Sequence, residues 1–161
     1  MTDIDDIYQH SDLETAIIQD DLERFHELIG NVELDHRSDN GGTLLHKAAS
    51  VGNDRMVEEL LNHGITPDIQ NQGGKTALHL AVDEGLRDVI ETLVVGGADP
   101  NIQDNSGTVP ILKLIYRGDV ELATLMIENG ADPEIETNGG VSPLDIAKDI
   151  DATEVVEVLK S

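Results

Sequence analysis

The chain repeats itself every 33 residues, and this period limits its possible folds more than any other property of the sequence. Similar segments start at Thr43, Thr76, Val109 and Ser142, each 33 residues after the one before. A weaker copy starts at Ser11, 32 residues before Thr43. A fixed period of this length is typical of chains that stack one supersecondary unit on the next. We therefore predict an all-α solenoid of about five units.

Each copy predicts two helices with a turn between them. Thr43, Thr76 and Ser142 are suited to cap the start of a first helix, and Pro110 and Pro143 suit its first turn. In the three central copies a glycine follows nine residues after the start and can end that helix in the left-handed conformation. A second helix is predicted from apolar residues at i, i+1, i+4 and i+5, as in Met56, Val57, Leu60 and Leu61.

A link rich in Asp, Asn, Pro and Gly follows the second helix. Such links predict projecting loops, or fingers, that form short β-hairpins or turns. The predicted organisation is an acidic tail over residues 1–7 and one repeat domain over residues 8–161. Its units cover about residues 8–37, 38–70, 71–103, 104–136 and 137–161.

The period and the starts Thr43-Leu44-Leu45-His46-Lys47-Ala48-Ala49 and Thr76-Ala77-Leu78-His79-Leu80-Ala81-Val82 resemble the ankyrin repeat. The resemblance covers about residues 8–161. It implies an L-shaped stack whose inner helices and finger tips form a concave surface for a protein partner. It also implies that His46 and His79 are structural, forming hydrogen bonds between neighbouring units.

Two kinds of departure from the pattern carry expectations of their own. The fourth copy has Leu112 in place of the histidine, and bulky Leu114 and Ile115 in place of small residues. These side chains should widen the gap between helices or be covered by the fifth copy. The first and last copies are more polar than the central ones and are expected to act as caps.

The charge and the residue types bound the function. Ten Lys and Arg against 33 Asp and Glu give a net charge of −23, which disfavours nucleic acid and anionic membranes as ligands. The chain has no cysteine, which removes disulfides and thiolate metal sites. No basic-then-apolar leader and no long apolar stretch are found, so we expect a cytoplasmic protein. We expect no cofactor, and a monomer.

Candidate chemical motifs each have a plainer structural explanation. Gly73-Gly74-Lys75-Thr76 resembles the end of a phosphate-binding loop, but Ile69 stands where the loop needs a glycine. The segment from Asp99 to Asp104 starts like a calcium loop but lacks its turn glycine. The carboxylates, including Asp83 and Glu84, have no evident nucleophile or cation beside them, so we expect no enzyme activity.

In an ankyrin-like stack, the partner contacts the two residues before each turn glycine and the finger tips. Tyr116 and Arg117 are the preferred anchors, because these residue types are enriched among energetically dominant interface residues. The predicted partner-binding residues are Asp39, Asn40, Ser50, Val51, Gln72, Lys75, Asp83, Glu84, Asn105, Ser106, Thr108, Tyr116, Arg117, Asn138 and Val141.

The predicted function is binding of a partner protein. The acidity leaves two interpretations open: a solvated surface, as in adaptation to high salt, or a surface that meets a basic partner. The alternative function is therefore an acidic inhibitor or immunity protein that neutralises a basic toxin or nuclease.

Overall fold

The computed structural model describes residues 4–30 and 32–160, with side chains from residue 10 onwards. Over these residues the chain forms helices joined by turns, and no strand. The helices are α1 (Ile4–Gln19), α2 (Leu22–Ile29), α3 (Leu44–Ser50), α4 (Asp54–Asn62), α5 (Ala77–Glu84), α6 (Arg87–Val95), α7 (Ile111–Arg117), α8 (Val120–Glu128), α9 (Pro143–Asp149) and α10 (Thr153–Leu159).

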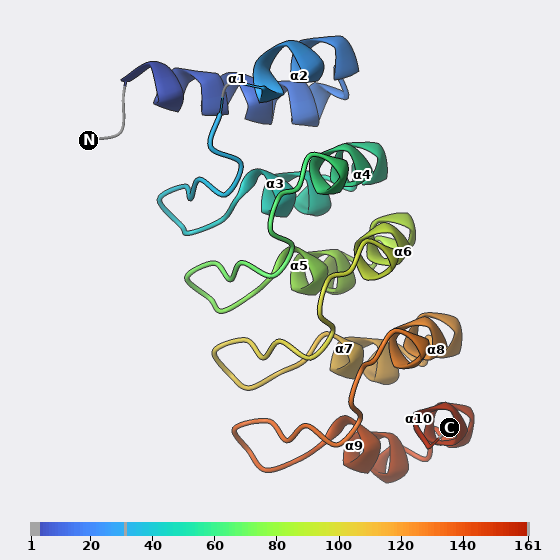
Figure 1. Cartoon of the computed structure of the whole chain (residues 1–161). Coiled ribbons are helices and arrows are strands. Elements are labelled where there is room, and N and C mark those ends of the chain that lie inside the picture. Colours follow the sequence, from blue (N-terminus) through green and yellow to red (C-terminus); the bar gives the residue numbers. More distant parts are fainter. Residues whose placement is uncertain (1–3, 31, 161) are drawn as a thin grey trace.

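The helices form two columns, and loops project to one side of them (Figure 1). The inner layer consists of α1, α3, α5, α7 and α9, and the outer layer of α2, α4, α6, α8 and α10. We call the loops over residues 33–43, 66–76, 99–109 and 132–142 the fingers. Each helix pair lies on the next, so the predicted all-α solenoid is confirmed.

Reciprocal hydrogen bonds set the start of three inner helices. The side chains of Thr43, Thr76 and Ser142 form capping boxes with the residue three positions later. Helix α7 lacks such a cap, because Val109 has no side-chain acceptor. There Pro110 leads into the helix, with its φ of −52° already helical and no N–H to satisfy.

The inner helices end in the left-handed conformation. Gly85 and Gly118 have φ of 73° and 67°, values that cost a glycine little. Asp20 and Asp151 hold the same place in the first and last units, with φ of 55° each. A residue with a Cβ is strained there, so the two end units are less well adapted than the central ones.

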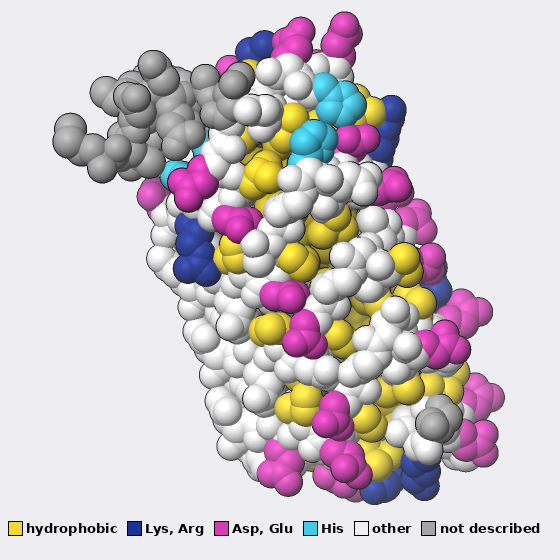
Figure 2. All heavy atoms as spheres, viewed as in Figure 1, with side chains coloured by type: hydrophobic (Ala, Val, Ile, Leu, Met, Phe, Trp, Pro, Cys, Tyr) yellow, Lys and Arg dark blue, Asp and Glu magenta, His cyan; other side chains and the backbone are white. Residues whose placement is uncertain are grey.

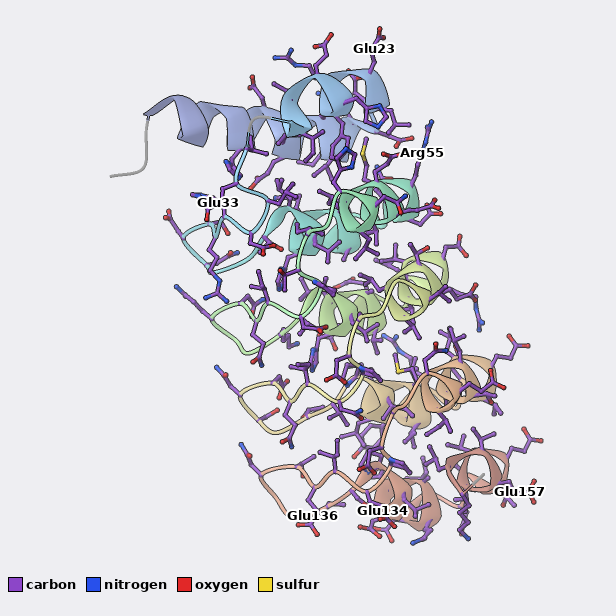
Figure 3. The ribbon with its side chains drawn as sticks, viewed as in Figure 1. Glu23, Glu33, Arg55, Glu134, Glu136 and Glu157 are labelled. Atoms are coloured by element: carbon purple, nitrogen blue, oxygen red, sulfur yellow. The ribbon has the colours of Figure 1, made fainter. Side chains whose placement is uncertain are left out.

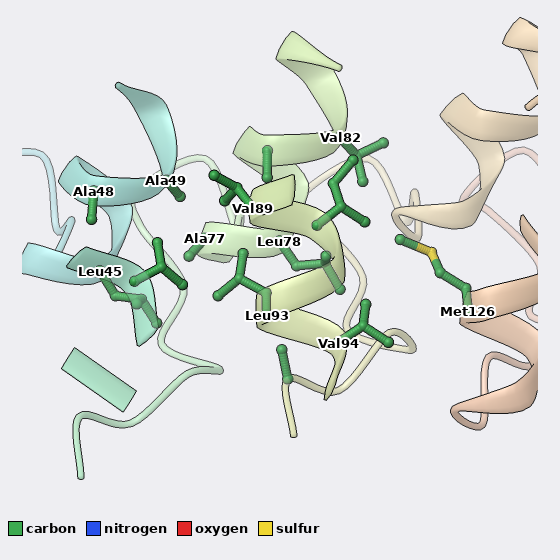
Figure 4. Close-up of a cluster of buried hydrophobic side chains, with 14 of the residues drawn as sticks. Leu45, Ala48, Ala49, Ala77, Leu78, Val82, Val89, Leu93, Val94 and Met126 are labelled. Carbon is green, nitrogen blue, oxygen red and sulfur yellow. The ribbon is translucent and has the colours of Figure 1, made fainter. Parts of the chain in front are cut away.

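The core runs through the whole stack between the two layers. Ala48 and Ala49 of α3 and Ala77 of α5 belong to this core, and their small side chains let the two helices pack closely (Figure 4). In the fourth unit Leu114 and Ile115 are 1% and 0% exposed. Helix α8 of the same unit and helix α9 of the fifth unit pack on α7. The bulky side chains are therefore covered, in agreement with the second of the two expectations.

Side-chain amides join each finger to the one before it. The amides of Gln72, Asn105 and Asn138 donate to the backbone oxygens of Asp39, Gln72 and Asn105 at 2.7, 2.9 and 3.1 Å. Backbone N–H groups of the same three residues also donate to the preceding finger. The fingers are thus turns tied into a ladder, without the strand pairing of the β-hairpins that the sequence allowed.

Helix α1 begins at Ile4, within the stretch predicted as a tail of residues 1–7. Residues 1–3 lie outside the described residues. A helix across this stretch is compatible with its Ile4-Asp5-Asp6-Ile7 sequence, since no proline or glycine interrupts it.

Candidate protein-binding surface

Exposed apolar side chains recur at the carboxyl ends of the inner helices. Ile18, Val51, Tyr116 and Ile150 are 55%, 45%, 58% and 45% exposed, although large apolar side chains are usually buried. They come from four different units and from the two positions before the turn residue. Since the units stack in register, these side chains form one row along the inner layer, which we call the apolar row.

The third unit breaks the apolar row with acidic residues. Asp83 and Glu84 hold the equivalent positions at the end of α5, and Glu84 is exposed. The carboxylate of Asp83 pairs with the ammonium group of Lys75 on the finger. The expectation that Asp83 has no cation beside it was therefore wrong, because Lys75 lies eight residues away in sequence and only the fold brings it close.

A hollow of about 370 Å³ lies beside the row between α5 and α7. Leu112 and Pro110 contribute apolar walls, and Tyr116 and Lys113 stand at its side. Lys113 is exposed, and no carboxylate among the described residues pairs with it. The hollow is also lined by Lys75, Asp83 and Asp104, so it combines apolar walls and an aromatic ring with charged groups of both signs, a combination suited to holding a partner side chain.

Arg117 is exposed but is held by hydrogen bonds to the preceding unit, unlike its neighbour Tyr116. Its guanidinium donates to the backbone oxygens of Val82 and Asp83, the latter at 2.6 Å. These carbonyls lie at the end of α5, where the Val82 oxygen also accepts from the N–H of Gly85 at 3.1 Å, and a cation there meets the negative end of the helix dipole. Arg117 thus joins the third and fourth units, and Tyr116 is left as the projecting member of the predicted pair.

The predicted finger residues also differ in their exposure. The predicted tips Asp39, Asn40, Gln72, Asn105, Ser106 and Asn138 are exposed, whereas Lys75, Thr108 and Val141 are half-buried. The side-chain amides of Gln72, Asn105 and Asn138 donate to the preceding finger, as described above. Part of their hydrogen-bonding capacity is therefore already used within the protein. The ladder holds the tips at a fixed spacing beside the inner helices.

The two repeat histidines are buried and structural. Nδ1 of His46 accepts from the N–H of Thr43 at 3.1 Å, so Nε2 carries the proton and donates to the Lys75 oxygen at 2.9 Å. His79 repeats this arrangement between Thr76 and Thr108. Burial lowers the pKa of both imidazoles below its usual value. Each histidine is therefore a neutral connection between two fingers.

A family model for ankyrin repeats in three copies matches residues 13–104. The chain belongs to the ankyrin repeat family. The search of curated proteins found no match. The structure continues the ankyrin architecture beyond the matched stretch, through α7 to α10. Among the described residues of this ankyrin stack, no helix is long and apolar enough to cross a membrane, and no group of three or more His, Asp or Glu is placed to hold a metal ion.

Charge is divided unevenly between the two layers of the ankyrin stack. In the second to fifth units, the inner helices α3, α5, α7 and α9 carry four acidic and four basic residues. The outer helices α4, α6, α8 and α10 carry nine acidic and two basic residues. Figure 2 shows the Asp and Glu side chains along the outer-layer edge. In Figure 3, Glu23 and Glu157 lie at opposite ends of that layer.

Only part of this surface could be identified from the sequence. The apolar row was partly visible, because each of its members lies within two residues of a turn glycine or aspartate. The Lys75–Asp83 pair was not, since it depends on how the finger folds against α5 within the third unit. The role of Arg117 was not either, since it depends on the contact of the fourth unit with the third. Spacing near 33 residues was the available signal: Arg117 lies 35 residues after Val82 and 34 after Asp83.

Proposed function

We propose that the chain binds a partner protein through the concave surface formed by the apolar row and the finger tips. Ankyrin repeats are generally protein–protein interaction modules, and ankyrin repeat proteins are typically non-enzymatic. The proposal adds the surface and the residues that form it.

The observation that carries the proposal is the apolar row itself. Single exposed apolar side chains are common on protein surfaces, but a series at the last two positions before the turn residue in four units indicates a contact surface. Burial of these side chains by a partner would remove apolar area from water, which is the main favourable term in protein association. Tyr116, as the aromatic member beside the hollow, is the proposed anchor.

Along the apolar row, the charge distribution favours apolar contact over electrostatic attraction. The inner helices of the second to fifth units have no net charge, whereas the support for an acidic inhibitor of a basic toxin or nuclease comes from the net charge of the whole chain. Among the helices of these units, only the outer ones taken together carry an excess of acidic residues. We therefore place the inhibitor second, as a function that would need a basic partner at Glu84 or at the outer helices.

The experiment is an affinity comparison with the partner recovered from native lysate on the immobilised chain. Tyr116→Ala should weaken binding by about 1 kcal/mol or more, which is about fivefold. It should leave the melting temperature almost unchanged, because the ring is largely exposed. Glu157→Gln, on the outer layer, is the control and should bind like the unchanged chain.

Two results would count against the proposal. One is an unchanged affinity together with a lower melting temperature, which would make Tyr116 a structural cover for the fourth unit. The other is a loss of binding in an outer-layer variant alone. A steep decrease of the association rate with salt, joined to inactivation of the captured protein, would favour the inhibitor instead.

A further inference from the structure

The outer layer contains an apolar groove that the concave surface does not involve. It lies between α4 and α6, has a volume of about 400 Å³, and is lined by Leu61, Val95 and Gly96 together with Glu58 and Glu91. Val95 is 74% exposed, more than any other large apolar side chain among the described residues. An apolar side chain this open at the edge of a groove is available to a ligand.

The groove exists because the third unit departs from its own repeat. The position of Val95 is Asn62 in the second unit and Glu128 in the fourth, and the position of Gly96 is His63 and Asn129. A Cβ at Gly96 would come 2.6 Å from Cδ1 of Leu61 and 2.8 Å from the backbone oxygen of Thr92. Any larger residue would thus press on Leu61 and fill the space.

The φ angle does not require glycine at this position. Gly96 has φ of −75°, which every residue adopts readily, whereas the next residue, Gly97, has φ of 92° and needs to be glycine. The glycine at position 96 is therefore explained by the close approach of Leu61 and of the Thr92 oxygen, and not by its φ angle.

Carboxylates stand on both walls of the groove. Glu58 of α4 is exposed and pairs with no cation among the described residues. Glu91 of α6 lies 3.8 Å from Arg87, but the same guanidinium is 3.1 Å from both Asp119 and Glu121. One cation shared by three carboxylates leaves the groove in a region of excess negative charge.

We propose that this groove binds a basic amphipathic segment of a partner protein. An apolar side chain of that segment, such as Leu, occupies the space above Leu61 and beside Val95. Lys or Arg residues on either side of it meet Glu58 and Glu91. Apolar burial supplies the affinity, and the opposite charges set the orientation and raise the association rate.

The test uses a short fluorescein-labelled amphipathic helix of Leu and Lys and the full chain, with binding followed by fluorescence anisotropy. Val95→Asn introduces the residue that the second unit already holds at this position, so the fold is expected to tolerate it. This variant should weaken binding about fivefold or more, as should the double variant Glu58→Gln with Glu91→Gln. Tyr116→Ala should leave binding of this peptide unchanged.

Two control peptides separate the contributions. A Leu and Glu helix should not bind, and a Lys and Ser peptide should bind far more weakly than the Leu and Lys helix. Equal binding of the Lys and Ser peptide would overturn the proposal, since charge alone would then suffice. Undiminished binding by Val95→Asn, with a melting temperature that shows the variant folded, would overturn it as well.

Discussion

Replacing Gly107 with alanine tests how closely the fingers must approach one another. Gly107 has φ of 77°, and a Cβ built on it would lie 2.5 Å from the backbone nitrogen of Asn138 in the next finger. Gly140 provides the control. Its φ is 72°, but as it belongs to the last finger, a Cβ there would meet nothing within 4 Å. The two substitutions share the backbone strain and differ in the steric contact.

The expected magnitudes follow from these geometries. Both alanines are placed in the left-handed region, which costs about 1 kcal/mol after the lower entropy of the unfolded alanine chain is counted. Gly107→Ala also pushes Asn138 away and breaks its backbone bond to Ser106 at 3.2 Å and its side-chain bond to Asn105 at 3.1 Å. Each bond contributes about 1 kcal/mol. We expect losses of about 1 kcal/mol for Gly140→Ala and about 3 kcal/mol for Gly107→Ala.

Urea unfolding followed by circular dichroism measures both variants. The difference in midpoint at an unchanged slope reports the change in the free energy of unfolding. Equal losses in the two variants would refute the reasoning, because the finger contact would then contribute nothing. A smaller loss for Gly107→Ala than for Gly140→Ala would refute it more strongly.

Further predictions concern the histidines, one end unit and the helix cap. Because burial lowers the pKa of His46 and His79 below the usual 6.5, the unfolded chain binds protons more readily, so urea midpoints should decrease as the pH falls below about 6.5. Asp151→Gly should raise the free energy of unfolding by about 0.5–1 kcal/mol by relieving the left-handed aspartate. Arg117→Ala should lower it by about 1–2 kcal/mol, whereas Lys113→Ala should not. Thermal and urea unfolding check both substitutions, and no change in either would contradict them.

Much of the fold was predictable because its causes are local. A threonine or serine that caps a helix and a glycine that ends one both act within a few residues, and the 33-residue period made each signal visible several times. The left-handed conformation of Asp151 also follows from its alignment with Gly85 and Gly118.

The rest depended on contacts between units, which a single copy of the repeat does not encode. Nothing near Arg117 in the sequence indicates that it caps a helix of the preceding unit. The groove beside Leu61 could not be predicted, because the sequence does not show that the φ angle at Gly96 is one that any residue adopts. The concave surface was predicted from the family resemblance, and the structure adds which side chains project there.

The ladder of finger amides has a consequence for changes in the length of the chain. Each donor finds its acceptor 33 residues earlier, as Asn105 does on Gln72 and Asn138 on Asn105. A tandem duplication of residues 71–103 would therefore give every new amide an acceptor in register, and the stack would become longer by one complete unit. An insertion of a different length within one finger would instead displace its amides from their acceptors in the neighbouring finger.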